Sequence, residues 1–109
     1  MLRTPLYELC RAGGGRMVPF AGWEMPVQFS GLIQEHKAVR NSVGMFDISH
    51  MGVLRLEGAN PKDTLQQLVP SDLHRIGPGE ACYTVLLNDQ GGIRDDLIIY
   101  DLGAIDEER

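Results

Sequence analysis

Two runs of alternating side chains around a glycine-containing turn constrain the fold of this chain more than any other feature. Residues 81–87 alternate as a strand does, and Asn88-Asp89-Gln90-Gly91-Gly92 has the composition of a tight turn. The adjacent carboxylates Asp95 and Asp96 open a second strand that continues over residues 97–102. Because successive side chains of a strand point to opposite faces, only one of the two carboxylates can enter a given pocket. The pattern predicts a β-hairpin with a carboxylate on each face.

One face of this predicted hairpin combines a carboxylate, an aliphatic side chain and a phenol. Asp96, Ile98 and Tyr100 share it, whereas Asp95, Leu97 and Ile99 share the other. Three such groups in a row could hold a heterocycle that carries an amine. The alternative is an ordinary hairpin whose carboxylates are solvated, which is the commoner situation for exposed acids.

Length and composition are those of a modest globular domain, or of a piece of a larger protein. The 109 residues are 43% hydrophobic and 23% charged, with ten basic and fifteen acidic residues and a net charge of −5. The sequence has no Lys/Arg cluster that would favour nucleic-acid binding, and no apolar run is long enough to span a bilayer. A cytoplasmic protein without a membrane or nucleic-acid partner is therefore expected. Cys10 and Cys82 have no metal-ligand spacing and are expected to be half-buried reduced thiols, although a single disulfide stays open.

The N-terminal half contains signals for two helices. Thr4 and Pro5 predict an N-cap and a first helical position, with Leu6, Leu9 and Cys10 facing inward and Gly13-Gly14-Gly15 ending the helix. Residues 16–29 are extended and apolar, but their two prolines argue for short edge strands, with Trp23 partly buried. Ser30 is the expected N-cap of a second helix that ends at Val43, with Gly44 as its C-terminal stop.

The second half predicts an incomplete mixed unit. Residues 53–57 alternate as a strand, and Asn60-Pro61 opens a short helix with Leu65 and Leu68 on one side. With the hairpin, the order becomes strand, helix, strand, strand, which is the first part of a split β-α-β (ferredoxin-like) motif in an α+β protein. A further helix and strand would close it, so the open sheet edge predicts self-association.

Four segments, in the right order and spacing, together resemble one family. They are Thr4-Pro5-Leu6-Tyr7, Phe20-Ala21-Gly22-Trp23-Glu24-Met25-Pro26, Gly44-Met45-Phe46-Asp47-Ile48-Ser49-His50-Met51-Gly52 and Gly91-Gly92-Ile93-Arg94-Asp95-Asp96-Leu97-Ile98. The chain resembles the aminomethyltransferases, the folate-dependent T-proteins of the glycine cleavage system. The resemblance extends from about residue 4 to residue 100 and implies the N-terminal part of the T-protein-type folate-binding fold. Residues 1–52 would begin the first folate-binding domain, and residues 53–109 an incomplete inserted domain, with the C-terminal domains absent.

The resemblance also implies a reaction and its partners. A lipoyl-bearing H-protein would present an aminomethyl group, tetrahydrofolate would accept its carbon as 5,10-methylenetetrahydrofolate, and ammonia would leave, with no metal involved. The chain alone is expected to be inactive and to bind folate weakly or not at all. The alternative is a folate-binding module without transferase activity, like the relatives that act in iron–sulfur assembly.

The family's functional positions match four residues here. Asp96 corresponds to the catalytic aspartate, and Met51, Tyr83 and Tyr100 correspond to folate contacts. A carboxylate near a folate nitrogen can accept its hydrogen and stabilise positive charge that develops there. His50 is expected to be a hydrogen-bonded structural histidine rather than a general base.

Overall fold

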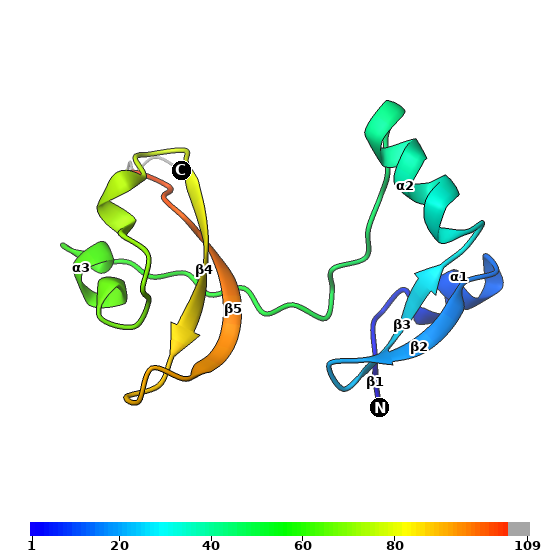
Figure 1. Ribbon diagram of the computed structural model, residues 1–109, viewed down its shortest axis with the longest axis horizontal. Helices are drawn as coiled ribbons and strands as arrows, with labels where there is room; N and C mark the ends of the chain where they lie inside the picture. Colours follow the sequence, from blue (N-terminus) through cyan, green and yellow to red (C-terminus); the bar gives the residue numbers. More distant parts are fainter. Residues whose placement is uncertain (105–109) are drawn as a thin grey trace. The chain divides into compact units, whose positions relative to one another are not determined.

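The chain has α+β architecture, as predicted, and is divided into two compact units (Figure 1). A computed structural model describes residues 1–104. The first unit is Met1–Leu54, and the second begins at Arg55. The assignment of these units to a first and an inserted folate domain stays a prediction.

The first unit contains a three-stranded sheet and two helices. Its elements are β1 (Leu2–Arg3), α1 (Tyr7–Ala12), β2 (Arg16–Phe20), β3 (Trp23–Gln28) and α2 (Leu32–Asn41). The strand order is β1-β3-β2, with β2 antiparallel and β1 parallel to β3. Tyr7 and Met25 are its buried hydrophobic side chains, at 6% and 8% exposure, so its core is small.

The expectation that both prolines lie on edge strands is wrong for β3. This strand contains Pro26 and lies between β1 and β2. Proline is tolerated there because β1 pairs with β3 only at Trp23 and Glu24, so that ladder does not need the amide hydrogen that proline lacks. Trp23 is half-buried, as predicted.

The predicted N-cap of the first helix is also wrong. Helix α1 begins at Tyr7, with Leu6 at the N-cap and no side-chain cap. The Thr4 hydroxyl donates instead to Asp47 Oδ2, at 2.6 Å, because the fold brings a charged acceptor to it. Tyr7 is the buried residue of the helix, whereas Leu9 is 70% exposed, contrary to the predicted inward face. Gly13 ends the helix, as predicted.

Helix α2 is shorter than predicted and is capped differently. It ends at Asn41, and its N-cap is Gly31 rather than Ser30. The Glu35 carboxylate accepts hydrogen bonds from the amides of Phe29 and Gly31, at 3.1 and 3.3 Å, and so satisfies donors at the helix start. Neither α2 nor any other helix in residues 1–104 is long and apolar enough to cross a membrane.

The strand predicted over residues 53–57, at the boundary between the two units, does not form. That segment has neither helix nor strand in the structure, and Val53 and Leu54 are 93% and 88% exposed. A strand is defined by its hydrogen-bonded neighbour, and the described residues contain no partner for this one. The elements that follow are α3 (Pro61–Gln66), a 3-10 helix η1 (Leu73–Arg75), β4 (Ala81–Leu87) and β5 (Ile93–Tyr100). The helix opening at Pro61 and the bounds of β4 agree with the sequence analysis.

One face of the β4–β5 hairpin is covered and the other is open. Helix α3 and η1 lie to one side of the two strands (Figure 1). Leu73 is fully buried, and Val69 and Thr84 are 5% exposed. The Ser71 hydroxyl bonds the Thr84 hydroxyl at 2.9 Å and so ties the η1 side of the unit to β4. The side chains on the opposite face of β4 and β5 are therefore free to meet a ligand.

Candidate functional site

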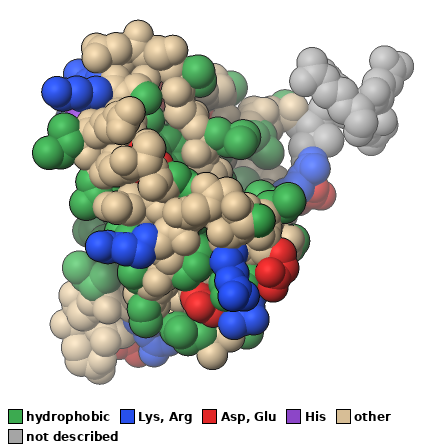
Figure 2. Space-filling model, turned by 90° about the vertical axis from the view of Figure 1, so that its right-hand side faces the viewer, with side chains coloured by type: hydrophobic (Ala, Val, Ile, Leu, Met, Phe, Trp, Pro, Cys, Tyr) green, Lys and Arg blue, Asp and Glu red, His purple; other side chains and the backbone are tan. Residues whose placement is uncertain are grey.

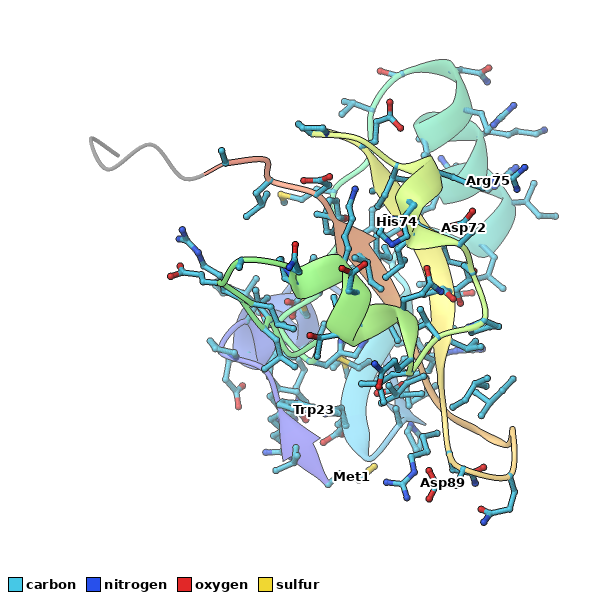
Figure 3. The ribbon with its side chains drawn as sticks, turned by 90° about the vertical axis from the view of Figure 1, so that its left-hand side faces the viewer. Met1, Trp23, Asp72, His74, Arg75 and Asp89 are labelled. Carbon is cyan, nitrogen blue, oxygen red and sulfur yellow. The ribbon has the colours of Figure 1, made fainter. Side chains whose placement is uncertain are left out.

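The turn that joins β4 to β5 is built from asparagine and glycine. Asn88 Oδ1 accepts from the amides of Gln90 and Gly92, at 3.0 and 2.8 Å, and the Asn88 amide donates to the Gly92 carbonyl at 2.8 Å. Gly91 has a φ of 78°, in the left-handed region that glycine adopts without strain. Asp89 lies at the tip of this turn (Figure 3). The turn closes a hairpin whose second strand, β5, starts at Ile93, two residues before the predicted Asp95, and ends at Tyr100, two residues before the predicted end at residue 102.

The strand register brings three of the four predicted site residues to one face. Residues paired across an antiparallel ladder point the same way, and the pairs here include Tyr83 with Ile98, Val85 with Asp96, and Ala81 with Tyr100. The predicted common face of Asp96, Ile98 and Tyr100 is confirmed, and Tyr83 joins it. All four side chains are exposed. Their contact with a ligand stays a prediction.

A short hydrogen bond links two of these residues. The Tyr83 hydroxyl donates to Asp96 Oδ2 at 2.5 Å, which is within the range of charge-assisted O–H···O⁻ bonds. The contact raises the pKa of the Tyr83 phenol, because the phenolate would lose this bond and lie beside a second negative charge. Tyr83 therefore stays a hydrogen-bond donor at neutral pH. Among the described residues, Asp96 Oδ1 accepts no hydrogen bond, so one oxygen is available to a ligand.

Asp95 does not share the face of β5 that carries Asp96. It pairs with Leu86 and so lies on the face opposite Asp96. Its Oδ1 accepts from the backbone amide of Asp96 at 2.9 Å. The Asp95 side chain therefore binds the backbone that carries Asp96 and is a matched acid outside the candidate site.

Met51, the fourth predicted site residue, belongs to the first unit. Its amide donates to the Ile48 carbonyl at 3.0 Å, and its side chain is 49% exposed. This hydrogen bond closes a turn over residues 48–51, which follows Asp47. Asp47 accepts hydrogen bonds from the Thr4 hydroxyl and from the amide and hydroxyl of Ser49. These bonds lower the pKa of Asp47, those from Ser49 and Thr4 most. The folate contact predicted for Met51 stays a prediction.

His50 differs from the expectation of a hydrogen-bonded structural residue. Its Nδ1 is buried and has no partner within residues 1–104. The ring meets Phe20 edge to face, with ring centroids 5.6 Å apart and an interplanar angle of 81°. Packing rather than hydrogen bonding therefore holds this side chain, and it shows no arrangement of a general base.

An apolar groove of the first unit was not predicted. It has a volume of about 500 Å³ and lies along β3, α2 and the segment after α2, where Phe29, Leu32, Val39 and Phe46 line it. It contains none of the four predicted site residues. Hydrophobic side chains reach much of the visible surface (Figure 2). Leu32 and Val39 are seven residues apart and therefore lie on one side of α2, but only the fold shows that this side lies open.

Other polar groups of the structure form pairs rather than a ligand-binding cluster. Arg3 Nε binds Glu24 Oε2 at 3.0 Å, and His74 Nε2 lies 3.0 Å from Asp63 Oδ1. Asp72 is the N-cap of η1, and its carboxylate accepts a hydrogen bond from the backbone amide of His74 at 3.0 Å (Figure 3). Within residues 1–104, no three His, Cys, Asp or Glu side chains gather as metal ligands would. Cys10 and Cys82 are both free and half-buried.

A known protein family matches nearly the whole chain. The family described as the GCVT N-terminal domain matches residues 6–106. The chain belongs to this family. Among relatives of this GCVT domain, an aminomethyltransferase of Synechococcus sp. (strain CC9902) is 98% identical over 109 residues, which are 100% of this chain and 30% of the relative. An aminomethyltransferase of Parasynechococcus marenigrum (strain WH8102) is 87% identical over 107 residues, 98% of the chain and 29% of the relative.

A solved structure confirms the predicted fold of this GCVT domain. The crystal structure of glycine cleavage system aminomethyltransferase T from Bartonella henselae matches with a TM-score of 0.78 and 39% identity. The match covers 93% of this chain and 28% of that one. The chain thus spans less than a third of the length of these relatives.

Proposed function

We propose that this chain forms part of an aminomethyltransferase of glycine cleavage and that its β4–β5 hairpin contributes the carboxylate that meets tetrahydrofolate. The observation that carries the proposal is an exposed Asp96 with one free carboxylate oxygen, in a chain 98% identical to the matching part of a protein named aminomethyltransferase. Family membership supports a folate ligand, because the resemblance identified on the sequence is to folate-dependent enzymes.

The proposed reaction moves one carbon between two carriers. The donor is an aminomethyl group bound through sulfur to the lipoyl arm of an H-protein. Its methylene carbon forms bonds to N5 and N10 of tetrahydrofolate, while its bonds to nitrogen and sulfur break. The two N–H protons of the folate appear in ammonia and in the released thiol. The products are 5,10-methylenetetrahydrofolate, ammonia and the reduced lipoyl group, so no external oxidant is needed.

Asp96 is assigned to the nitrogens of the folate. Its free oxygen can accept a hydrogen bond from an N–H group of the acceptor and stabilise positive charge as the new C–N bond forms. Tyr100 lies on the same face of β5 beyond Ile98, is 64% exposed, and offers an aromatic ring to the flat pterin. We assign Met51 a packing contact with the folate, since its thioether side chain is half-exposed. The H-protein as donor and a cytoplasmic location belong to the same proposal.

The proposal is tested in a full-length chimera: the Synechococcus sp. (strain CC9902) aminomethyltransferase in which this chain replaces the matching 109 residues. Asp96→Asn keeps the shape of the side chain and removes its charge. We expect kcat to fall by about 10²-fold, the scale of a lost acid–base or charge-stabilising group, with tetrahydrofolate binding retained in calorimetry. Formation of 5,10-methylenetetrahydrofolate from aminomethylated H-protein is the assay.

Asp95→Asn is the matched control. It changes the adjacent residue on the opposite face and keeps the oxygen that accepts the Asp96 amide. Its kcat should stay within about twofold of the unchanged chimera, as for a surface substitution away from the site. Unchanged transfer in Asp96→Asn would refute the role of Asp96. A chimera that binds tetrahydrofolate but transfers nothing, before any substitution, would support the folate-binding module instead.

A further inference from the structure

The contact between Tyr83 and Asp96 is set by the register of the hairpin. Tyr83 lies opposite Ile98, and Asp96 lies opposite Val85. Val85 is two residues after Tyr83 in β4, and Asp96 is two residues before Ile98 in β5. The two side chains are therefore diagonal neighbours on the same face, a separation that a long aromatic side chain can span. The Tyr83 hydroxyl meets Asp96 Oδ2 at 2.5 Å, although both residues are exposed.

An exposed aspartate on a strand has several rotamers, and a hydrogen bond to one oxygen selects among them. Here the bond holds Oδ2 and leaves Oδ1 without a partner in the described part of the chain. The carboxylate of Asp96 is thus oriented before any ligand arrives.

Building on the proposed function, we propose that Tyr83 is a positioning residue: its hydroxyl holds Oδ2 of Asp96 and directs Oδ1 to the reacting nitrogen of the folate. Preorganisation of this kind raises the rate of a step, because the group does not reorient during the reaction. The raised pKa of the phenol keeps its proton in place at the pH at which the reaction would run.

The second tyrosine of the face is not equivalent. Tyr100 lies opposite Ala81, a small side chain, and its hydroxyl has no hydrogen-bond partner within residues 1–104. The Tyr100 ring is therefore free to pack on a ligand, whereas the Tyr83 hydroxyl already has an acceptor. The assignment of positioning to Tyr83 rests on this difference in contacts.

The test is Tyr83→Phe in the full-length chimera. Loss of a hydrogen bond to a charged group is expected to lower kcat by about tenfold. The KM for tetrahydrofolate should change by less than about threefold, because the ring that packs on the hairpin remains. Tyr7→Phe is the matched control, since Tyr7 also donates to a carboxylate, Glu24 at 3.2 Å, in the first unit. Its kcat should be unchanged.

The double variant Tyr83→Phe/Asp96→Asn separates positioning from an independent contact. If Tyr83 acts through Asp96, adding Tyr83→Phe to Asp96→Asn lowers kcat by less than about twofold. A full tenfold further loss, an unchanged kcat in the single variant, or a raised KM with kcat unchanged would each overturn the inference. If one of these outcomes occurs but Asp96→Asn still lowers kcat strongly, only the role of Tyr83 is refuted and the proposed function stands. If Asp96→Asn leaves kcat unchanged, the proposed function itself is refuted.

A measurement that keeps Tyr83 guards against a variant that fails to fold. In the 109-residue chain, Asp96→Asn should lower the pKa of the Tyr83 phenol, because the carboxylate is its main cause of elevation. The titration is followed by NMR with 13C-labelled tyrosine. An unshifted Tyr83 resonance would show that the hydrogen bond does not form and would overturn the inference.

Discussion

At the scale of single residues, Asp47 is the carboxylate that joins segments far apart in the first unit. It accepts from the buried Thr4 hydroxyl and from the amide and hydroxyl of Ser49. The bond to Thr4 connects the start of the chain to a segment 43 residues later. Because that segment contains neither helix nor strand, these side-chain bonds rather than a backbone ladder hold it at this point.

The lowered pKa of Asp47 predicts how the first unit responds to acid. The carboxylate form has hydrogen-bond donors in the folded chain and water in the unfolded chain, so its folded pKa lies below the ordinary 3.8. Its contribution to the free energy of unfolding is complete above that ordinary value and is lost as pH falls through the folded pKa. Asp47→Asn should make the free energy of unfolding of the first unit less dependent on pH below about pH 4.

Fluorescence of Trp23, the single tryptophan of the chain, reports the acid unfolding of this unit. Asparagine keeps an acceptor oxygen in place of Asp47 but cannot titrate, so it isolates the charge. Glu80→Gln, in the second unit, is the matched control and should leave the tryptophan signal unchanged. The prediction would be contradicted if the free energy of unfolding fell equally steeply with decreasing pH in the original chain and in Asp47→Asn.

At the scale of elements, the β4–β5 hairpin depends on its turn for register. The five residues between the strands place Leu87 opposite Ile93, with an irregularity between Leu86 and Leu87. A slip of one residue would move Asp96 and Tyr83 to opposite faces. The turn is therefore part of the candidate site even though none of its residues belongs to the face.

Gly91→Ala is expected to loosen this hairpin. A Cβ at Gly91 would meet no atom within 4 Å, so the penalty comes only from the left-handed φ of 78°. That strain costs about 1 kcal/mol for alanine, equivalent to a roughly fivefold larger equilibrium constant for opening of the hairpin. Native-state hydrogen exchange of the β4 and β5 amides measures it.

Gly77→Ala is the control in the same unit. Its Cβ would also meet nothing within 4 Å, and its φ is not in the left-handed region. Exchange in β4 and β5 should therefore change little. Equal effects of the two substitutions would show that strain at Gly91 does not govern the hairpin.

At the scale of the whole molecule, the chain consists of two small units with many exposed apolar side chains. In the segment that leads to the unit boundary, Val53 and Leu54 are almost fully exposed, as is Met45 before them. Exposed apolar surface of this extent favours association with another polypeptide surface. The predicted self-association through an open sheet edge stays a prediction.

Limited proteolysis should identify this boundary. Arg55 lies in an exposed segment without helix or strand, whereas Arg16 lies in β2, Arg40 lies in α2 and Lys62 is half-buried in α3. Proteases cut where the backbone can leave its surroundings without unfolding a helix or strand. Trypsin should therefore cleave first after Arg55 and produce residues 1–55 and 56–109, which mass spectrometry identifies. Arg55→Gln should slow the first cut, and a first cut at the same rate in that variant would refute the boundary.

Features that depend on a few neighbouring residues were predicted from the sequence. The glycine turn, the bounds of β4, the proline opening of α3 and the shared face of Asp96, Ile98 and Tyr100 are all of this kind. Helix ends were less accurate, since α1 starts three residues after Thr4 and α2 ends two residues before Val43. The residue that caps a helix depends on which hydrogen bonds its side chain forms. The Thr4 hydroxyl bonds the distant Asp47 instead of capping α1.

The amino-acid sequence by itself determined the hairpin, its alternation and the family to which the chain belongs, because local periodicity and short motifs carry that information. Only the tertiary structure decided which groups meet across the chain. Thr4 bonds Asp47 rather than capping a helix, and β3 lies in the middle of its sheet despite Pro26. Among residues 1–104, no strand pairs with residues 53–57. The same holds for the bond from Tyr83 to Asp96, since it requires the register of two strands. A side chain's partner depends on where the backbone brings other groups, and pairing of distant segments is not encoded in any local pattern.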